Sequence, residues 1–216
     1  MIAGIVLAAG QSSRLGRPKQ LLPLQGEPLL RHTLRAILAS SLDDVLVVVG
    51  HEADVVREAI ADLPVRVVFN PEFATGQSTS VRAGLDALAS DTNAAMFLLG
   101  DQPTVDPQVI DSLIDAWQKT KSPVVAPKYR DGIGNPVLFD RAIFPKLTAL
   151  RGDTGARKIV RAHQQRGRLH VVEITDPAPP DIDTEDDYAA LKASLPEFPR
   201  ITPPSPGSDG RGGQGG

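Results

Sequence analysis

The sequence contains no cysteine among its 216 residues. Disulfide bonds, thiolate metal sites, iron–sulfur clusters and cysteine nucleophiles are therefore all excluded. Aromatic residues are also scarce, at 4% of the chain, although hydrophobic residues make up 41%. Because few rings are available, a buried core must be filled by Val, Leu, Ile and Ala, which is the composition typical of parallel β-sheets covered on both faces.

The chain also lacks an excess of charge of either sign. It has 23 Lys and Arg against 26 Asp and Glu, a formal net charge of −3, so no global positive field attracts a nucleic acid. No apolar stretch approaches the ~20 residues of a membrane helix, and the apolar opening lacks the basic residues of a signal peptide. We therefore expect a soluble, cytoplasmic protein with no nucleic acid or membrane partner.

Apolar runs rich in β-branched residues alternate along the chain with segments of helical periodicity. The runs predict strands at residues 2–9, 45–49, 65–69, 94–99, 123–126 and 170–174. Amphipathic stripes between them predict helices over residues 29–38, 55–60 and 109–117. This alternation predicts right-handed βαβ units and an α/β fold, a three-layer, Rossmann-like α/β/α arrangement around a mostly parallel sheet.

The domain organisation follows from the same patterns. We expect one domain over residues 1–195, with its first half ending near residue 103 and its second spanning residues 104–195. Residues 196–216 are Pro, Ser and Gly with little apolar content, which predicts a disordered tail. In an open α/β sheet the ligand lies beyond the carboxyl ends of the strands, so the residues that follow each strand are the candidate site.

The stretch LAAGQSSRLGRPK, which follows the first predicted strand, does not match the familiar phosphate loops. A P-loop has four residues between its glycines and then Lys-Ser/Thr, whereas Gly10 and Gly16 have five between them and Arg17 follows. The Gly-x-Gly-x-x-Gly dinucleotide fingerprint is absent as well. A small-residue turn followed by Arg14, Arg17 and Lys19 is nevertheless suited to a polyphosphate; the alternative is a solvated surface loop.

Acidic residues follow two later strands. Asp101 follows the apolar run 94–99 after Gly100, and its carboxylate there can hold Mg²⁺ against a nucleotide phosphate. A second acidic cluster covers residues 181–187 and opens a helix. Asp183 is a candidate metal ligand there, although Asp183 or Thr184 also suits a helix N-cap.

Several of these motifs occur together in an order that resembles the molybdenum cofactor nucleotidyltransferases. They are Leu7-Ala8-Ala9-Gly10 with Ser12, Arg14, Gly16 and Lys19, then Gly76-Gln77-Ser78-Thr79-Ser80, Gly100-Asp101-Gln102-Pro103, Gly134-Asn135-Pro136 and Gly152-Asp153-Thr154-Gly155-Ala156-Arg157. The sequence is most similar to the cytidylyltransferases of that family, from about residue 2 to about residue 191.

The resemblance implies a nucleotidyltransferase fold and a set of site residues. The catalytic residues would be Arg14, Lys19 and Asp101, and Mg²⁺ would be held by Asp101 and Asp183. Nucleotide-binding residues would be Leu7, Ala8, Ala9, Gly10, Arg14, Lys19, Asn70, Gln77, Ser78 and Ser80. Acceptor-binding residues would be Gly134, Asn135, Pro136 and Arg157.

For some of these residues an ordinary structural role is an open alternative. Residues 77–80 also fit a Ser/Thr helix N-cap, and the sequence Asn-Pro at Asn70 also forms turns. Arg157 is equally suited to a solvated basic helix start.

The resemblance also implies a reaction, in which the phosphate of molybdenum-loaded molybdopterin attacks the α-phosphorus of CTP and releases pyrophosphate. Ala9 favours CTP, because family members that use a guanine nucleotide tend to have a second glycine there and a methyl group would crowd a purine. A molybdoenzyme or its maturation chaperone would receive the product.

Other functions remain to be separated from this one. A pyrimidine nucleotidyltransferase acting on a sugar or polyol phosphate shares the reaction class. A non-catalytic carrier of the molybdenum cofactor would bind the pterin but would not need Asp101. An NAD-dependent oxidoreductase is disfavoured by the missing glycine fingerprint.

Overall fold

The computed structural model describes residues 1–12 and 14–195, so the predicted disordered tail lies outside the described residues. The strands are β1 (Ile2–Ala8), β2 (Pro23–Leu24), β3 (Glu27–Pro28), β4 (Asp44–Val49), β5 (Arg66–Phe69), β6 (Ala94–Leu99), β7 (Val124–Tyr129), β8 (Gly132–Ile133), β9 (Val137–Asp140) and β10 (Leu169–Glu173). The α-helices are α1 (Leu29–Leu38), α2 (Ala53–Ala59), α3 (Gln77–Asp86), α4 (Pro107–Thr120), α5 (Phe144–Thr148), α6 (Arg157–Gln165) and α7 (Glu185–Ser194). Short 3₁₀ turns lie at Lys19–Leu21, Phe73–Thr75 and Arg141–Ile143.

The central sheet is mostly parallel, as the sequence predicts. Its strand order is β10-β7-β9-β6-β1-β4-β5, and β8 pairs with β7 outside this path. The pairs β1–β4, β1–β6, β4–β5 and β7–β10 are parallel. Strand β9 is antiparallel to both β6 and β7 and joins the two parallel groups.

The sequence patterns do not predict β9. Its apolar part is only Val137, Leu138 and Phe139, a run too short to separate from a loop by periodicity. All three side chains are nevertheless buried. Pairing on both sides, which is invisible in a local window, makes this short segment a central strand.

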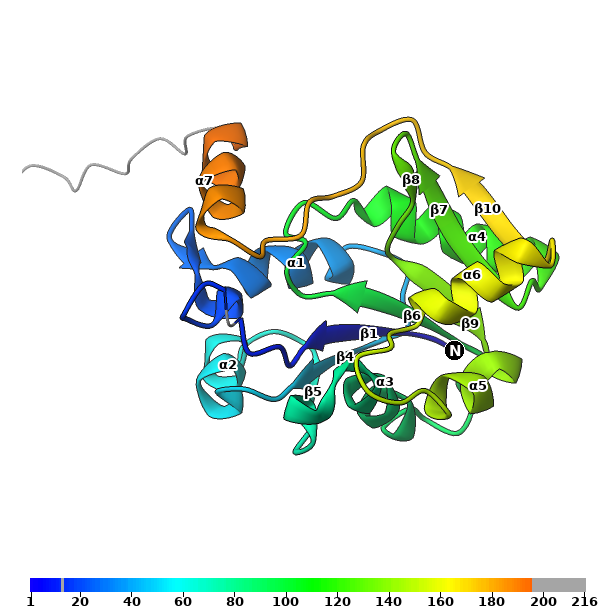
Figure 1. The fold of residues 1–216 in the computed structure, drawn as a ribbon, viewed down its shortest axis with the longest axis horizontal. Helices are drawn as coiled ribbons and strands as arrows, with labels where there is room; N and C mark the ends of the chain where they lie inside the picture. The colour runs from blue at the N-terminus through cyan, green and yellow to red at the C-terminus, as the bar shows by residue number, and fades with distance from the viewer. Residues whose placement is uncertain (13, 196–216) are drawn as a thin grey trace, which may run out of the picture.

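Helices cover both faces of the sheet, which confirms the three-layer prediction (Figure 1). One core cluster packs α1, α2 and α4 against the sheet, with Leu34, Val56 and Trp117 among its members. The other cluster packs α3, α5 and α6 through residues such as Val81 and Leu147. Burying both faces explains why the strands read as continuous apolar runs rather than alternating ones.

A third apolar cluster joins the two ends of the described chain. Leu15, Leu22, Leu24 and Leu29 come from the loop after β1 and the start of α1, and they pack with Ile182, Tyr188 and Leu191. Helix α7 accordingly lies beside the blue segment between β1 and α1 (Figure 1). This packing places the residues near 183 at the edge of the sheet where β1 and β6 have their carboxyl ends.

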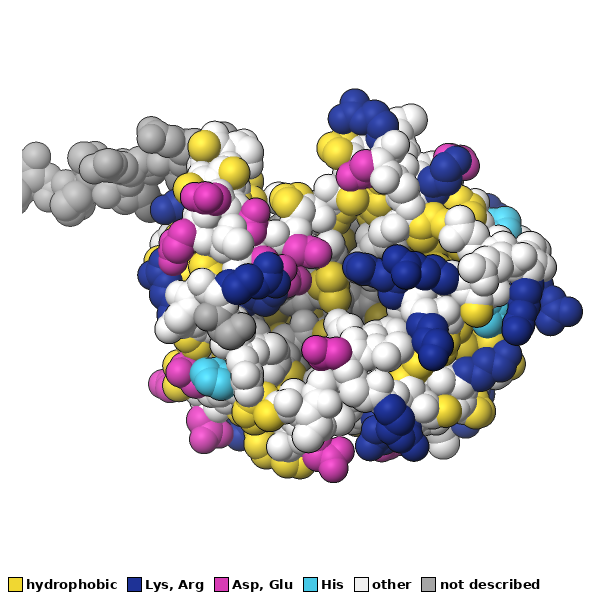
Figure 2. Space-filling model, viewed as in Figure 1, with side chains coloured by type: hydrophobic (Ala, Val, Ile, Leu, Met, Phe, Trp, Pro, Cys, Tyr) yellow, Lys and Arg dark blue, Asp and Glu magenta, His cyan; other side chains and the backbone are white. Residues whose placement is uncertain are grey.

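Charged side chains are unevenly spread over the face shown in Figure 2. Most Asp and Glu side chains gather on the side of α7, whereas Lys and Arg gather on the side of α5 and α6 (Figure 2). The molecule is hollowed between α7 and the β7–β8 side of this face (Figure 2).

Candidate active site

The loop after β1 is held by side chains from its own far end. The hydroxyl of Ser12 accepts the backbone N–H of Lys19 at 3.0 Å. The amide of Gln20, which is only 2% exposed, donates to the carbonyl of Ala8 at 2.7 Å. These bonds fold the loop back on the end of β1, so that Lys19 emerges at the carboxyl edge of the sheet.

At that edge the side chain of Lys19 lies between two carboxylates. Its Nζ contacts Oδ2 of Asp101 and lies 2.9 Å from Oδ1 of Asp183. Arg14 reaches the other oxygen of Asp183 at 2.8 Å. The side chains of Lys19 and Asp101 are only 16% and 13% exposed, whereas those of Asp183 and Arg14 are 36% and 67% exposed. The structure thus gathers the candidate catalytic and metal-ligating residues into one cluster.

The close charges in this cluster shift the pKa values of Lys19 and Asp183. Burial lowers the pKa of Lys19, but the carboxylates of Asp101 and Asp183 outweigh it, so the pKa of Lys19 is raised above its ordinary value. The hydrogen bond from Lys19, supported by the charge of Arg14, holds the pKa of Asp183 below its ordinary range. At neutral pH the cluster therefore contains a protonated ammonium and an ionised Asp183.

The N-cap of α7 is Thr184 and not Asp183. The Thr184 hydroxyl accepts the N–H of Asp187, and the Asp187 carboxylate accepts the N–H of Thr184 in return, which forms a capping box. The sequence allows either Asp183 or Thr184 as the N-cap, and in the structure it is Thr184. The carboxylate of Asp183 is free to face Lys19.

Asp101 and Asp183 are the residues that could hold a divalent cation. Their carboxylates converge on a space that already contains a positive charge, and carboxylate oxygens are the ligands preferred by Mg²⁺ and Mn²⁺. Among residues 1–12 and 14–195, no group of three or more His, Asp or Glu is arranged for a metal. A cation here would complete its coordination with water or nucleotide oxygens, as Mg²⁺ commonly does.

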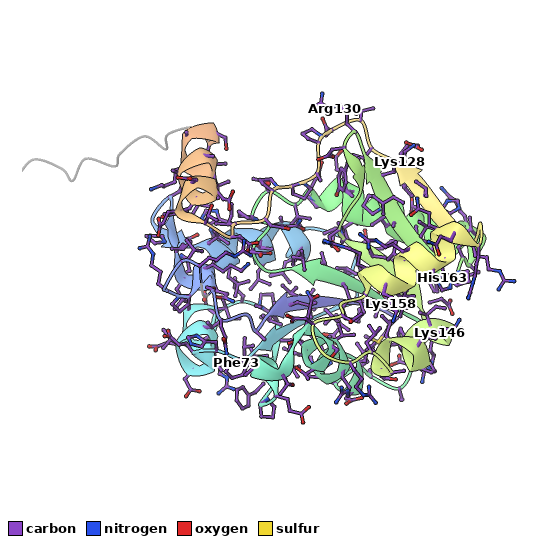
Figure 3. All side chains as sticks on the ribbon, in the orientation of Figure 1. Phe73, Lys128, Arg130, Lys146, Lys158 and His163 are labelled. Carbon is purple, nitrogen blue, oxygen red and sulfur yellow. The ribbon has the colours of Figure 1, made fainter. Side chains whose placement is uncertain are left out.

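A cavity of about 740 Å³ lies between the ends of β1 and β6, the strands that precede Lys19 and Asp101 in the chain, and the segment 133–137 and helix α6. Its lining includes the predicted acceptor residues Gly134, Asn135 and Arg157, whereas Pro136 is not part of it. Apolar lining side chains are Leu7, Phe97, Leu99, Ile133, Val137 and Val160. The basic residues that line it are Arg157, Lys158 and Arg161, with Lys158 near the start of α6 (Figure 3). The lining therefore combines apolar side chains with three cations and one acid, Asp153.

The start of α3 is already occupied by the loop 152–155. The N–H of Ser78 donates to Gly152 O at 3.1 Å, and the N–H of Gln77 reaches Asp153 at 3.4 Å. Gly76 permits this approach, because its φ is +120° and an added Cβ would lie 2.4 Å from the carbonyl carbon of Gly152. The amides that the sequence offers to a base are therefore engaged within the chain, while the Gln77 side chain lines the cavity.

Asn70 and Ser80 lie beneath the surface rather than at it. Asn70 is 2% exposed, and its amide donates to the hydroxyls of Thr79 and Ser80 at 2.8 and 3.0 Å. Its carbonyl oxygen accepts the N–H of Glu72 at 3.0 Å. Ser78 is also buried, at 1% exposed. In this arrangement Asn70 fastens the loop after β5 to the first turn of α3.

The first turn of the loop is partly buried as well. Ala8 and Ala9 are 3% and 5% exposed, and Gly10 is exposed. The Ala9 methyl group belongs to a core cluster against which Phe73 packs. The expectation that this methyl group selects the base by crowding it stays a prediction.

Two residues that help to form the site are absent from the site residues predicted from the sequence. Gln20 holds the carbonyl of Ala8, and Asp153 lines the cavity and meets the start of α3. No local pattern marks Gln20, since a polar residue after Lys19 reads as exposed. Asp153 lies inside a quoted motif, but only the fold shows which helix it contacts.

A mostly parallel α/β sheet with cations and carboxylates gathered at its carboxyl edge defines a nucleotide-handling enzyme. A model of the MobA-like NTP transferase domain matches residues 4–167, three quarters of the chain. The chain therefore belongs to the MobA-like NTP transferase family and is a nucleotidyltransferase. The resemblance seen in the sequence motifs is confirmed at the level of the family.

Similar proteins cover nearly the whole length of the chain. Nicotine blue oxidoreductase of Paenarthrobacter nicotinovorans is 30% identical over 85% of this chain and 92% of its own. Purine catabolism protein PucB of Bacillus subtilis (strain 168) is 29% identical over 90% of this chain and 97% of its own. The first of these two proteins is named as an oxidoreductase.

A solved structure agrees with the fold. Rv0371c of Mycobacterium tuberculosis H37Rv, crystallised in complex with manganese, is 33% identical, with a TM-score of 0.78 over 90% of this chain and 99% of its own. As for membranes, none of the helices within the described ranges combines the length and apolar character that a span requires.

Proposed function

We propose that the protein transfers CMP from CTP to molybdenum-loaded molybdopterin in a Mg²⁺-dependent reaction, giving molybdopterin cytosine dinucleotide and pyrophosphate. The family is defined by nucleotidyl transfer, and the base, the acceptor and the metal are the parts that we propose here.

The observation that carries it is the convergence of Arg14, Lys19, Asp101 and Asp183 after β1 and β6, together with a cavity at the ends of the same strands that is lined by apolar side chains and by the cations of α6. A triphosphate needs cations, a metal needs carboxylates, and an acceptor phosphate needs a second set of cations. The first set, Arg14 and Lys19, comes from the loop after β1, and the second set comes from α6.

Asp101 and Asp183 would hold Mg²⁺, which would neutralise charge on the triphosphate when bound. The hard oxygen donors of this pair fit the ion, and manganese in the solved structure of the similar Mycobacterium tuberculosis protein supports a divalent cation. Lys19 would then turn from the carboxylates to the phosphates. Together with Arg14 it would stabilise the charge that builds on the leaving pyrophosphate.

The acceptor would lie in the cavity of about 740 Å³. Its pterin ring would rest against Leu99, Val137 and Val160, and its phosphate would face Arg157. Gly134 and Asn135 supply the rim, and the adjacent Pro136 fixes the backbone that follows them.

The reaction needs no covalent enzyme intermediate. One oxygen of the acceptor phosphate would attack the α-phosphorus of CTP, the bond between the α-phosphorus and the bridging oxygen would break, and that oxygen would leave on pyrophosphate with its electron pair. The residues of this chain position the two substrates in line and balance the charge.

Of the remaining candidate residues, some would contact the nucleotide and others would hold the start of α3 in place. Leu7, Ala8, Ala9 and Gly10 would offer the turn on which ribose and base rest. Gln77 would reach the nucleotide from the start of α3, whereas Asn70, Ser78 and Ser80, being buried, would act by holding that start in place.

The test is pyrophosphate release by purified protein with Mg²⁺ and molybdenum-loaded molybdopterin, comparing CTP, GTP, ATP and UTP. Asp101→Ala should lose activity by orders of magnitude, while Asp62→Ala, which removes an exposed carboxylate paired with Arg31, should not. Release with GTP instead of CTP would overturn the base assignment and leave the reaction intact.

The same assay separates the alternatives. Release with sugar or polyol phosphates but not with molybdopterin would move the acceptor to that class. Tight molybdopterin binding that survives Asp101→Ala without any release would identify a carrier that hands the cofactor to a molybdoenzyme or its chaperone. Oxidation of a nicotinamide nucleotide in a parallel reaction would support the redox chemistry named for the Paenarthrobacter nicotinovorans protein.

A further inference from the structure

Tyr129, the last residue of β7, connects the acceptor cavity to the interior of the protein. It is 4% exposed, and its hydroxyl donates to the backbone carbonyl of Asn135 at 2.8 Å. A buried tyrosine hydroxyl needs a partner, and here the partner is a residue that lines the cavity.

The ring of Tyr129 also determines how close the loop can lie. A Cβ added to Gly134 would be 3.0 Å from Cδ2 and Cε2 of the ring, so only glycine fits at this distance without a shift. The N–H of Gly134 donates to Pro127 O at 3.3 Å from the same strand. Loop residues 134 and 135 are thus held against β7 by a ring contact and two hydrogen bonds.

Tyr129 also borders a second space. This cavity of about 300 Å³ is lined by Tyr129, Thr104, Val109, Ile174 and the segment 176–180. Packing around Tyr129 is therefore incomplete where it borders this cavity. The hydroxyl adds a directional bond to the ring contact with Gly134.

We propose that Tyr129 is a positioning residue for the acceptor: its hydroxyl holds Asn135 and Gly134 at the rim of the larger cavity in the geometry that receives the acceptor. The inference rests on the proposed function for the identity of the acceptor. Tyr129 should affect the binding of the acceptor and not that of the nucleotide, because it contacts Gly134 and Asn135, which line the proposed acceptor cavity.

Burial supports the hydroxyl as a constant donor. It raises the pKa of Tyr129 to about 12, with a smaller contribution from the nearby acids Asp106 and Asp131. The proton is therefore present throughout the range in which the enzyme would be assayed.

The test is Tyr129→Phe, which removes the hydroxyl and keeps the ring, with Tyr188→Phe as the matched control. Tyr188 is 5% exposed and its hydroxyl donates to the carbonyl of Pro23, in the cluster around α7. Both variants lose one buried hydroxyl bond to a backbone carbonyl, so their losses of stability should be similar.

We expect Tyr129→Phe to raise KM for molybdenum-loaded molybdopterin about three- to tenfold, the usual worth of one hydrogen bond, with kcat and KM for CTP unchanged. Tyr188→Phe should leave KM for the acceptor at the wild-type value. An equal acceptor KM in the two variants, or a parallel change in the KM for CTP, would overturn the assignment.

Two readouts do not depend on turnover. Amide hydrogen exchange of peptides that cover residues 132–137 should speed up in Tyr129→Phe and not in Tyr188→Phe, and unchanged exchange would contradict the role. Equilibrium dialysis of molybdopterin without nucleotide should show the same loss of affinity. If wild-type protein releases no pyrophosphate with any acceptor, the proposed function fails, and exchange and dialysis still decide the role of Tyr129.

Discussion

The position of Lys19 predicts that removing its charge will strengthen metal binding and slow catalysis. Its ammonium lies against both carboxylates that would hold the divalent ion. A metal can enter between Asp101 and Asp183 only by displacing it. In Lys19→Met, a side chain of similar length without charge, that competition is absent.

The magnitude follows from the distances and exposures. Two unit charges 4 Å apart interact by about 4 kcal/mol at the effective dielectric constant of a protein surface. Asp183 is 36% exposed and screened by water, and the lysine recovers part of the energy by hydration when it leaves. A net cost of about 1.4 to 2.8 kcal/mol for displacing Lys19 corresponds to a gain of about 10- to 100-fold in Mn²⁺ affinity for Lys19→Met.

The assay is calorimetric titration of Mn²⁺ into the protein without nucleotide, followed by pyrophosphate release. The matched control is Arg17→Met, which removes the same unit of charge from the exposed pair with Glu185. We expect Arg17→Met to bind Mn²⁺ nearly as the wild type does. Lys19→Met should also lose about 10²- to 10³-fold in rate, because a donor to the leaving group is gone.

Equal Mn²⁺ affinity in wild type, Lys19→Met and Arg17→Met would refute the idea that Lys19 competes for the carboxylates. A similar gain in both variants would show that only net charge matters. Either result would move the metal away from Asp101 and Asp183.

Three further predictions concern stability. The lowered pKa of Asp183 means that its ionised carboxylate stabilises the fold at pH values above the ordinary pKa near 3.8, and this stabilisation is lost as pH falls through the depressed pKa. Asp183→Asn should therefore lower the urea midpoint at pH 7, and the difference should shrink as pH falls below about 4 and vanish once pH is below the depressed pKa. Gly76→Ala should cost about 1 to 3 kcal/mol in urea unfolding, because of its positive φ and the clash with Gly152, while Gly10→Ala, which meets nothing within 4 Å, should cost little. Leu191→Ala should cost about 2 to 5 kcal/mol, because its 3%-exposed side chain fills the cluster beneath α7.

Much of the sheet could be predicted from the sequence, because the central parallel strands β1, β4 and β6 are buried on both faces and form nearly continuous apolar runs. The run at residues 94–99 coincides with β6 (Ala94–Leu99). Strand β9 (Val137–Asp140) could not be predicted, since its identity depends on pairing with β6 and β7 rather than on its own four residues.

The site divides in the same way. Glycines, cations and acids that follow the ends of strands mark the segments that form the site. The contacts of Lys19, however, join it to Asp101, 82 positions away, and to Asp183, 164 positions away, and no local spacing can encode such contacts. Likewise, the side-chain bond of Gln20 to Ala8 and that of Tyr129 to Asn135 depend on how loops fold back. Only the three-dimensional arrangement distinguishes such residues from ordinary buried polar groups.

The return of α7 to the first loop affects the order in which the protein can mature during translation. Lys19 leaves the ribosome long before Asp183 exists, and Leu15, Leu22 and Leu24 have no Ile182, Tyr188 or Leu191 to cover them until then. A nascent chain that has completed β1 through β10 would thus carry an exposed leucine patch next to an unfinished site. Synthesis of α7 would cover the leucine patch and bring Asp183 to Lys19 in a single step.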